Sequence, residues 1–174
     1  FLIIALLAPI LSGIADASGN KLSFMKFFVY MGSMSCGALF FFTGENLEFG
    51  IICSVLASIG FSGSIVFYNS FLPEIAKEEE FDLLSAKGFA LGYIGSVILL
   101  VFNLLTIQFP EWFGMPTGSF APRFSFLITG IWWVGFAQIP FRVLPNNPYK
   151  KSISSDYLWK GYREVSLVFR ELRS

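Results

Sequence analysis

A short segment between two apolar runs carries an acid and a base on either side of a glycine. Gly13, Asp16, Gly19 and Lys21 follow one another closely along the chain. Gly13 leaves room for a neighbouring helix, and Gly19 permits the positive φ of a tight turn. The Asp16 carboxylate suits the positive N-terminal end of another helix, whereas the Lys21 ammonium would stay in water. By itself this pattern could also be that of an ordinary short loop.

Five polar or aromatic residues interrupt the apolar runs and are candidates for contact with a substrate. Asn69 and Asn103 would be costly against lipid, so we expect them to face other helices or water. Tyr68 lies next to Asn69, and Trp132 and Trp133 fall within the body of the last run. Two interpretations stay open for these residues. They either bond and pack between helices, or they line the path of a small-molecule substrate.

Residues for catalysis or metal binding are scarce in this chain. It has no histidine, which removes the commonest metal ligand and general base. Cys36 and Cys53 lie in separate apolar runs, where we expect both thiols to behave as small hydrophobes. We therefore predict no enzyme activity, no metal and no cofactor. The net charge of zero offers no basic patch for nucleic acid.

The elements that must position these residues are transmembrane helices. The chain is 55% hydrophobic and only 14% charged, against about 25% charged in a typical soluble domain. Four intervals without Asp, Glu, Lys or Arg each approach the roughly 20 residues that cross a bilayer as a helix. A fifth run, residues 1–12, is long enough for half a membrane and suggests a fragment cut inside a span. We predict an all-α, polytopic transmembrane bundle with spans at 1–12, 24–42, 49–72, 82–107 and 124–144.

The distribution of basic residues sets the orientation of the bundle. Of the twelve Lys and Arg residues, only Arg123 falls on the side opposite to the others. Lys and Arg concentrate on the cytoplasmic side of membrane proteins, so Lys21 and its loop are predicted to be cytoplasmic. Residues 1–144 then form the bundle. Residues 145–174 read as a cytoplasmic amphipathic connector, because apolar residues recur there at helical spacing among basic ones.

Small residues predict close helix packing. Gly88, Gly92 and Gly95 lie at three- and four-residue spacing in the fourth span. The third span repeats serine at every fourth residue from Ser54, and the second is rich in glycine and serine around Gly32. Because lipid tails are as apolar as leucine, membrane helices associate where small residues let their backbones approach. The pattern indicates a packed bundle without identifying it.

In its place after an inward-running span, the first segment resembles the hallmark loop of the major facilitator superfamily, G-x-L-A-D-x-x-G-R-[KR]. The matching positions are Gly13, Ala15, Asp16, Gly19 and Lys21. Ile14 replaces the leucine conservatively. Ala17 and Asn20 stand where basic residues are usual. These two departures weaken the expectation that this chain has the family's charge-relay network, but they leave the expected role of the acidic residue unchanged.

Further blocks are similar to the vacuole-effluxer-like branch of that superfamily, which includes the fungal autophagy-related amino-acid effluxer and bacterial members. They are residues 68–76, 85–95, 126–133 and 161–164, so the resemblance covers nearly the whole chain. It implies that the chain holds the second to sixth spans of a twelve-span protein of a bacterial inner (cytoplasmic) membrane. Its partners would then be the lipid bilayer, a small-molecule substrate and the remainder of the protein, namely the first span and the second six-helix half.

The resemblance also implies a function. Members of the superfamily rock two halves around a central site, so we expect a secondary active transporter for small polar solutes such as amino acids. The resemblance also makes Gly13, Asp16, Gly19 and Lys21 a candidate conformational-switch loop, in which Asp16 would latch the cytoplasmic side when the protein opens outward. The alternative is a non-transporting scaffold or regulatory protein with the same fold, motivated by the lack of charge at membrane depth.

Overall fold

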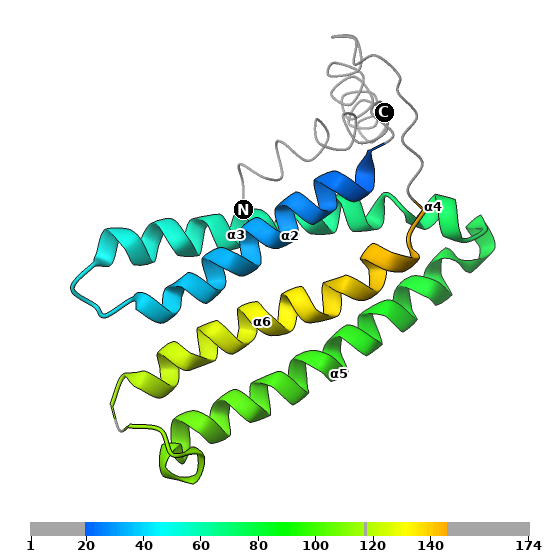
Figure 1. Ribbon diagram of the computed structural model, residues 1–174. Helices are drawn as coiled ribbons and strands as arrows, with labels where there is room; N and C mark the ends of the chain where they lie inside the picture. Colours follow the sequence, from blue (N-terminus) through cyan, green and yellow to red (C-terminus); the bar gives the residue numbers. More distant parts are fainter. Residues whose placement is uncertain (1–19, 117, 146–174) are drawn as a thin grey trace, which may run out of the picture.

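The described part of the chain, residues 20–116 and 118–145 of the computed structural model, is built from helices that run back and forth (Figure 1). The long helices are α2 (Lys21–Ala38), which continues into the 3-10 turn η1 (Leu39–Phe41), α3 (Leu47–Asn69), α5 (Phe81–Gln108) and α6 (Phe120–Val143). Shorter elements connect them: α4 (Leu72–Ile75), η2 (Glu78–Glu80) and η3 (Pro110–Phe113). No strand occurs in the described ranges, and the predicted all-α fold is confirmed.

The helix ends differ from the predicted spans by a few residues, for local reasons. The α6 helix begins at Phe120 instead of residue 124, so Pro122 and Arg123 lie in its first turn. Proline is tolerated there because the first N–H groups of a helix have no partner within the helix. The α2 helix begins at Lys21, and α3 ends at Asn69. Apart from Pro145, the predicted span 1–12 and the connector 145–174 lie outside the described residues.

All four long helices are long and apolar enough to cross a membrane. Within lipid a backbone must satisfy its own hydrogen bonds, and a continuous helix does so. The helices expose large apolar side chains over much of their length, including Leu91 (71% exposed) and Ile131 (59%). A soluble monomer rarely exposes such extended apolar surface. The chain is therefore part of an integral, multi-pass membrane protein.

The α2 helix lies in the middle of the described bundle and packs on both α3 and α6. At the α2–α3 crossing, Gly32 and Gly60 face each other so closely that a Cβ on Gly60 would lie 2.6 Å from the Gly32 nitrogen. At the α2–α6 crossing, a Cβ on Gly130 would lie 2.7 Å from the carbonyl oxygen of Ser33. Helix backbones approach this closely only where side chains are missing.

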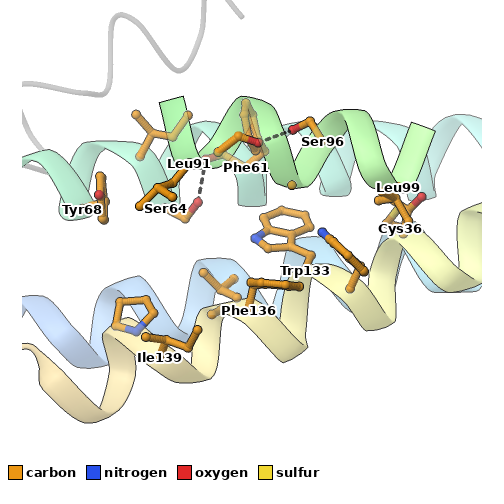
Figure 2. Close-up of a pocket in the computed structure, with 18 of the residues that line it drawn as sticks. Cys36, Phe61, Ser64, Tyr68, Leu91, Ser96, Leu99, Trp133, Phe136 and Ile139 are labelled. Atoms are coloured by element: carbon orange, nitrogen blue, oxygen red, sulfur yellow. Dashed lines mark hydrogen bonds between the residues drawn. The ribbon is translucent and has the colours of Figure 1, made fainter. Parts of the chain in front are cut away.

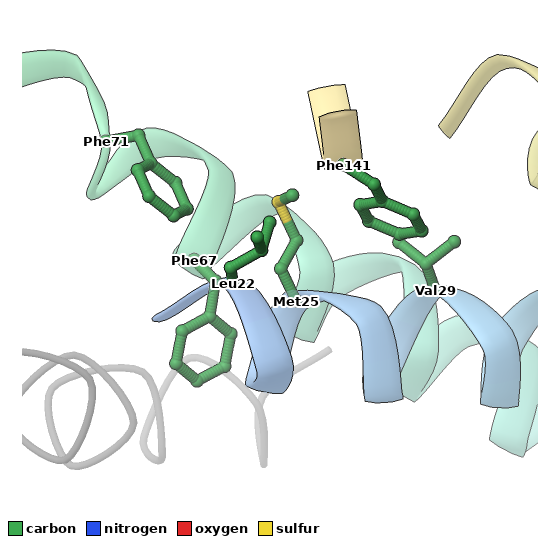
Figure 3. Close-up of a cluster of buried hydrophobic side chains, with 6 residues drawn as sticks. All are labelled: Leu22, Met25, Val29, Phe67, Phe71 and Phe141. Carbon is green, nitrogen blue, oxygen red and sulfur yellow. The ribbon is translucent and has the colours of Figure 1, made fainter. Parts of the chain in front are cut away.

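An aromatic cluster holds together the N-terminal end of α2 and the C-terminal ends of α3 and α6 (Figure 3). Its buried members are Leu22, Met25, Val29, Phe67, Phe71 and Phe141. The Phe67 ring is fully buried and stacks on Phe24 and Phe28, with centroid distances of 5.4 and 5.6 Å. These contacts fix the helix ends from which the candidate switch loop emerges.

Arg123 connects the C-terminal end of the α2–η1 segment to the N-terminal end of α6. Its Nε donates a hydrogen bond to the Phe40 carbonyl, and its guanidinium lies over the Phe40 ring, 5.1 Å from the centroid. The Phe40 carbonyl belongs to the end of the α2–η1 segment, where helix carbonyls lack partners within the helix. The single basic residue assigned to the outer side therefore caps a neighbouring helix.

Candidate functional site

An ion pair connects the first residue of α2 to the short helix α4 that follows α3. The Lys21 ammonium lies 2.8 Å from Oε1 of Glu74 and donates a second hydrogen bond to the Ser70 carbonyl at 3.2 Å. Lys21 is the first residue of α2, whereas Ser70 and Glu74 lie just after α3. The ion pair thus connects the end of the predicted switch segment to the connection between α3 and α5.

Of the four predicted switch residues, the structure describes Lys21 alone. Gly13, Asp16 and Gly19 lie outside the described residues, and their role stays a prediction. Glu74 received no role from the sequence. The available signal was its charge and its position, because Glu74 lies on the same predicted side as Lys21 and directly after a span. The expectation that Lys21 simply stays in water is wrong, since its side chain is only 15% exposed.

Charge exchange tests this ion pair. We expect Lys21→Glu to lower the free energy of unfolding of the full-length protein by about 1 kcal/mol, because it places two carboxylates together at a partly exposed site. The double variant Lys21→Glu/Glu74→Lys should recover most of that loss, as measured by thermal unfolding in detergent. Lys87→Glu is the matched control, since Lys87 is exposed at the same end. Equal losses in Lys21→Glu and in the double variant would show that the contact is not a functional pair.

A cavity of about 1120 Å³ lies between the four long helices (Figure 2). Its walls come from α2, α3, α5 and α6, and they are mostly apolar. In Figure 2, Trp133 projects from α6 toward Phe61 of α3. Trp133 packs edge-to-face on Phe61, with ring centroids 6.0 Å apart.

The five candidate substrate-path residues are not all at this cavity. Tyr68, Trp132 and Trp133 line it, whereas Asn69 and Asn103 do not. Asn69 is exposed at the end of α3. Asn103 reaches Thr129 of α6, with Nδ2 3.4 Å from Oγ1, and its Oδ1 is buried without a partner among the described residues. The geometry of Asn103 thus fits the interhelical interpretation, and that of Tyr68 fits the pathway interpretation.

Trp133 has a packing role as well as a place in the cavity wall. Its indole covers Gly32, where an added Cβ would lie 2.8 Å from Cζ3 of the ring. The same ring touches Phe61 of α3, so it bridges α2, α3 and α6. Trp132 also lines the cavity and packs at a tilt on Phe136, with ring centroids 4.6 Å apart.

The hydroxyl groups of the cavity wall donate to their own helices. Ser58, Ser64 and Ser96 donate to backbone carbonyls three or four residues earlier, at 2.9, 2.7 and 2.8 Å. Thr129 likewise donates to the Ser125 carbonyl at 2.7 Å. The protons of these four hydroxyl groups are therefore already donated, and most of the cavity wall is apolar.

The predicted packing glycines of α5 make no close helix contact in the described residues. A Cβ on Gly92 or Gly95 would meet nothing within 4 Å, and one on Gly88 would meet only the Tyr68 hydroxyl, at 3.3 Å. The close crossings of the described bundle use glycines of α2, α3 and α6 instead. Gly88, Gly92 and Gly95 line the cavity. Their role in helix packing stays a prediction.

Comparison with known proteins identifies the family. The family described as "Vacuole effluxer Atg22 like" matches residues 1–174. The chain belongs to this family. The resemblance to the vacuole-effluxer-like branch of the major facilitator superfamily is thereby confirmed. No solved structure gives a significant match.

Curated relatives of this Atg22-like chain come from a bacterium and from fungi. One is the uncharacterized MFS-type transporter YxiO of Bacillus subtilis, 40% identical over 139 residues, which are 79% of this chain and 32% of the relative. Another is autophagy-related protein 22-2 of Neosartorya fischeri, 22% identical over 229 residues that cover 92% of this chain and 37% of the relative. The chain therefore spans about a third of the length of these relatives.

Proposed function

We propose that the full-length protein is a secondary active transporter that works by alternating access. Membership of the Atg22-like family over the whole chain carries this proposal. The name of the Bacillus subtilis relative, an MFS-type transporter, supports it. Alternating access needs two states of the cytoplasmic side. The segment of Asp16 and Lys21 is the candidate switch, because Lys21 already pairs with Glu74 across two cytoplasmic connections.

The proposed substrates are small polar solutes, with amino acids as the first class to test. Tyr68 is the candidate contact of this chain, because it lines the cavity near its cytoplasmic end and lies half-exposed beside the bare backbone of Gly88. The mostly apolar cavity wall would not hold a polar solute well, since the protons of its serine and threonine hydroxyl groups are already donated. The rest of the pathway is assigned to the remainder of the protein, and the proposed location is a bacterial cytoplasmic membrane.

Flux through the full-length protein in lipid vesicles tests the transport proposal. We expect gradient-dependent movement of at least one member of a panel of radiolabelled amino acids, with protein-free vesicles as the baseline. Absence of flux for every amino acid, together with flux of another small solute, would remove the substrate class only. Absence of all flux from correctly folded protein would favour the alternative of a non-transporting scaffold with the same fold.

Asp16→Asn tests the switch. If the carboxylate stabilises one state of the cytoplasmic side, its neutralisation should slow flux about tenfold, a size typical of coupling between two states. The side chain keeps its shape, so folding and expression should be little changed. Glu79→Gln is the matched control, because it removes one exposed negative charge from the same end of the bundle. Wild-type flux in Asp16→Asn would exclude the latch role.

A further inference from the structure

We propose that the surface where α2 and α6 meet, at the end of the bundle where α2 begins and α6 ends, binds the phosphate of an anionic phospholipid. Each helix contributes two side chains to this lipid site: Lys26 and Tyr30 come from α2, and Gln138 and Arg142 come from α6. The two helices pack on each other along their length and run antiparallel (Figure 1). None of the four residues lines the cavity, so the lipid site is separate from it.

The contacts between the helices bring the two basic residues to neighbouring positions. Gln138 donates from Nε2 to the Tyr30 hydroxyl oxygen at 3.4 Å. The Lys26 ammonium lies 5.6 Å from the centre of the Phe141 ring, on which Tyr30 also packs, with centroids 5.7 Å apart. Residues four apart share one face of a helix. Lys26 is thus one turn from Tyr30, and Arg142 is one turn from Gln138, both toward the same end of the bundle.

These two positive charges have no carboxylate partner among the described residues. The described ion pair joins Lys21 to Glu74 instead. Lys26 lies against the face of the Phe141 ring, which attracts a cation but carries no net charge, and Arg142 is exposed. Two like charges at neighbouring positions repel each other, and an anion that contacts both removes that repulsion. The charge at this surface therefore calls for an anionic ligand.

The depth of Lys26 favours a phospholipid over a soluble anion. The segment from Lys21 to Phe41 has 21 residues, or about 30 Å, which is the thickness of the hydrocarbon core. Lys26 lies five residues from its start, about 7.5 Å along the axis. An unpaired ammonium is costly at such a depth, so its side chain extends toward the lipid head groups. Basic sites between transmembrane helices on the cytoplasmic side bind anionic head groups, and this end is the predicted cytoplasmic side.

The surface also provides for the rest of a lipid molecule. Gln138 donates to the Tyr30 oxygen, so the Tyr30 hydroxyl keeps its own proton for a phosphate or ester oxygen. Toward the middle of the membrane the same helix faces continue with Met34 of α2 and Ile131 of α6, which are 71% and 59% exposed. Acyl chains can pack on these apolar side chains, whereas a free phosphate ion gains nothing from them. The inference concerns lipid binding and holds whether or not the protein transports.

Lipid binding to the purified full-length protein tests the site. Delipidated protein in a neutral detergent is titrated with phosphatidylglycerol or phosphatidylcholine, and bound lipid is measured by native mass spectrometry. We expect phosphatidylglycerol to bind more tightly. Lys26→Gln/Arg142→Gln should weaken its binding roughly 30-fold, which is about 2 kcal/mol at 1.4 kcal/mol per tenfold, the contribution of two basic residues near a membrane surface.

The matched control is Lys77→Gln/Lys87→Gln, which removes the same charge from two exposed positions at the same end of the bundle. It should bind phosphatidylglycerol like the wild type. Tyr30→Phe keeps the ring that packs on Phe141, so folding should be unchanged while phosphatidylglycerol affinity falls severalfold. Equal affinity in the wild type and the Lys26/Arg142 double variant, or equal affinities for the two lipids, would overturn the proposal.

A cross-linking experiment locates the bound lipid. Phosphatidylglycerol with a photoreactive diazirine in its acyl chain is added to the full-length protein, and the labelled peptides are identified by mass spectrometry. We expect labels on the peptides that contain Met34 and Ile131, and an excess of inorganic phosphate should not displace them. Labels confined to other segments, or displacement by inorganic phosphate, would contradict a phospholipid site here. Neither experiment measures transport, so failure of this inference is distinct from failure of the transport proposal.

Discussion

Gly60→Ala is expected to destabilise the full-length protein strongly, and Gly60→Leu to prevent recovery of folded protein. The added Cβ would lie 2.6 Å from both the Gly32 nitrogen and the Phe28 carbonyl oxygen and would collide with the Gly32 Cα. All three atoms are backbone, so no side chain can turn away and the helices must separate. Overpacking a well-packed interior typically costs about 1–3 kcal/mol, and the alanine should reach the upper part of that range.

Two comparisons show whether backbone contact is the cause. Gly135→Ala makes the same change where an added Cβ meets nothing within 4 Å, so it should be neutral or slightly stabilising, as alanine favours helices. Gly63→Ala would meet the Phe28 ring, and a side chain can yield; we expect an intermediate loss. The measurements are the melting temperature and the monodisperse fraction in detergent. Equal stability of Gly60→Ala and Gly135→Ala would be incompatible with the crossing.

Phe67→Ala is expected to cost about 3 kcal/mol, at the low end of the range for truncation of a buried phenylalanine. The ring is fully buried and stacks on Phe24 and Phe28, so its removal leaves a void where the ends of α2, α3 and α6 meet. Aromatic stacking adds about 0.5–1.5 kcal/mol beyond the area buried. Phe67→Leu keeps most of the volume and should lose clearly less.

The matched control for Phe67 is Phe27→Ala on the neighbouring helix. Phe27 is 59% exposed and meets Phe28 only at its edge, with ring planes at 79°. Its truncation in the full-length protein should shift the melting temperature little. Comparable losses in Phe67→Ala and Phe27→Ala would indicate that the aromatic cluster does not hold the helix ends together.

The helices and the family could be predicted from the sequence, because both depend on local information. Each charge-free run is about as long as a bilayer is thick, and a chain in lipid must satisfy its backbone by local hydrogen bonds. The predicted spans within the described residues accordingly lie within about five residues of the helix ends. The start of α6 differs from the prediction because Pro122 is tolerated in the first turn of the helix. The apolar pattern of the sequence does not show how many residues the helix extends before the apolar run.

The candidate site could be predicted only in part. Lys21 was singled out from the pattern of its loop, but Glu74 was not, because 53 positions separate the two residues and no local pattern links them. Asn103 and Tyr68 looked alike in the sequence. In the structure Asn103 reaches Thr129 across a helix contact, whereas Tyr68 lines the cavity, because their two helices present different faces to their neighbours.

The sequence by itself determined that this chain crosses a membrane repeatedly, which loops carry the positive charge, and to which family it belongs. Only the tertiary structure decided which glycines make the helix crossings: Gly32, Gly60 and Gly130 meet backbone, whereas Gly92 and Gly95 face a cavity. The physical reason is that lipid and a neighbouring helix are almost equally apolar. A small residue therefore looks the same in the sequence on either face, and the rotation of each helix about its axis is set by its neighbours.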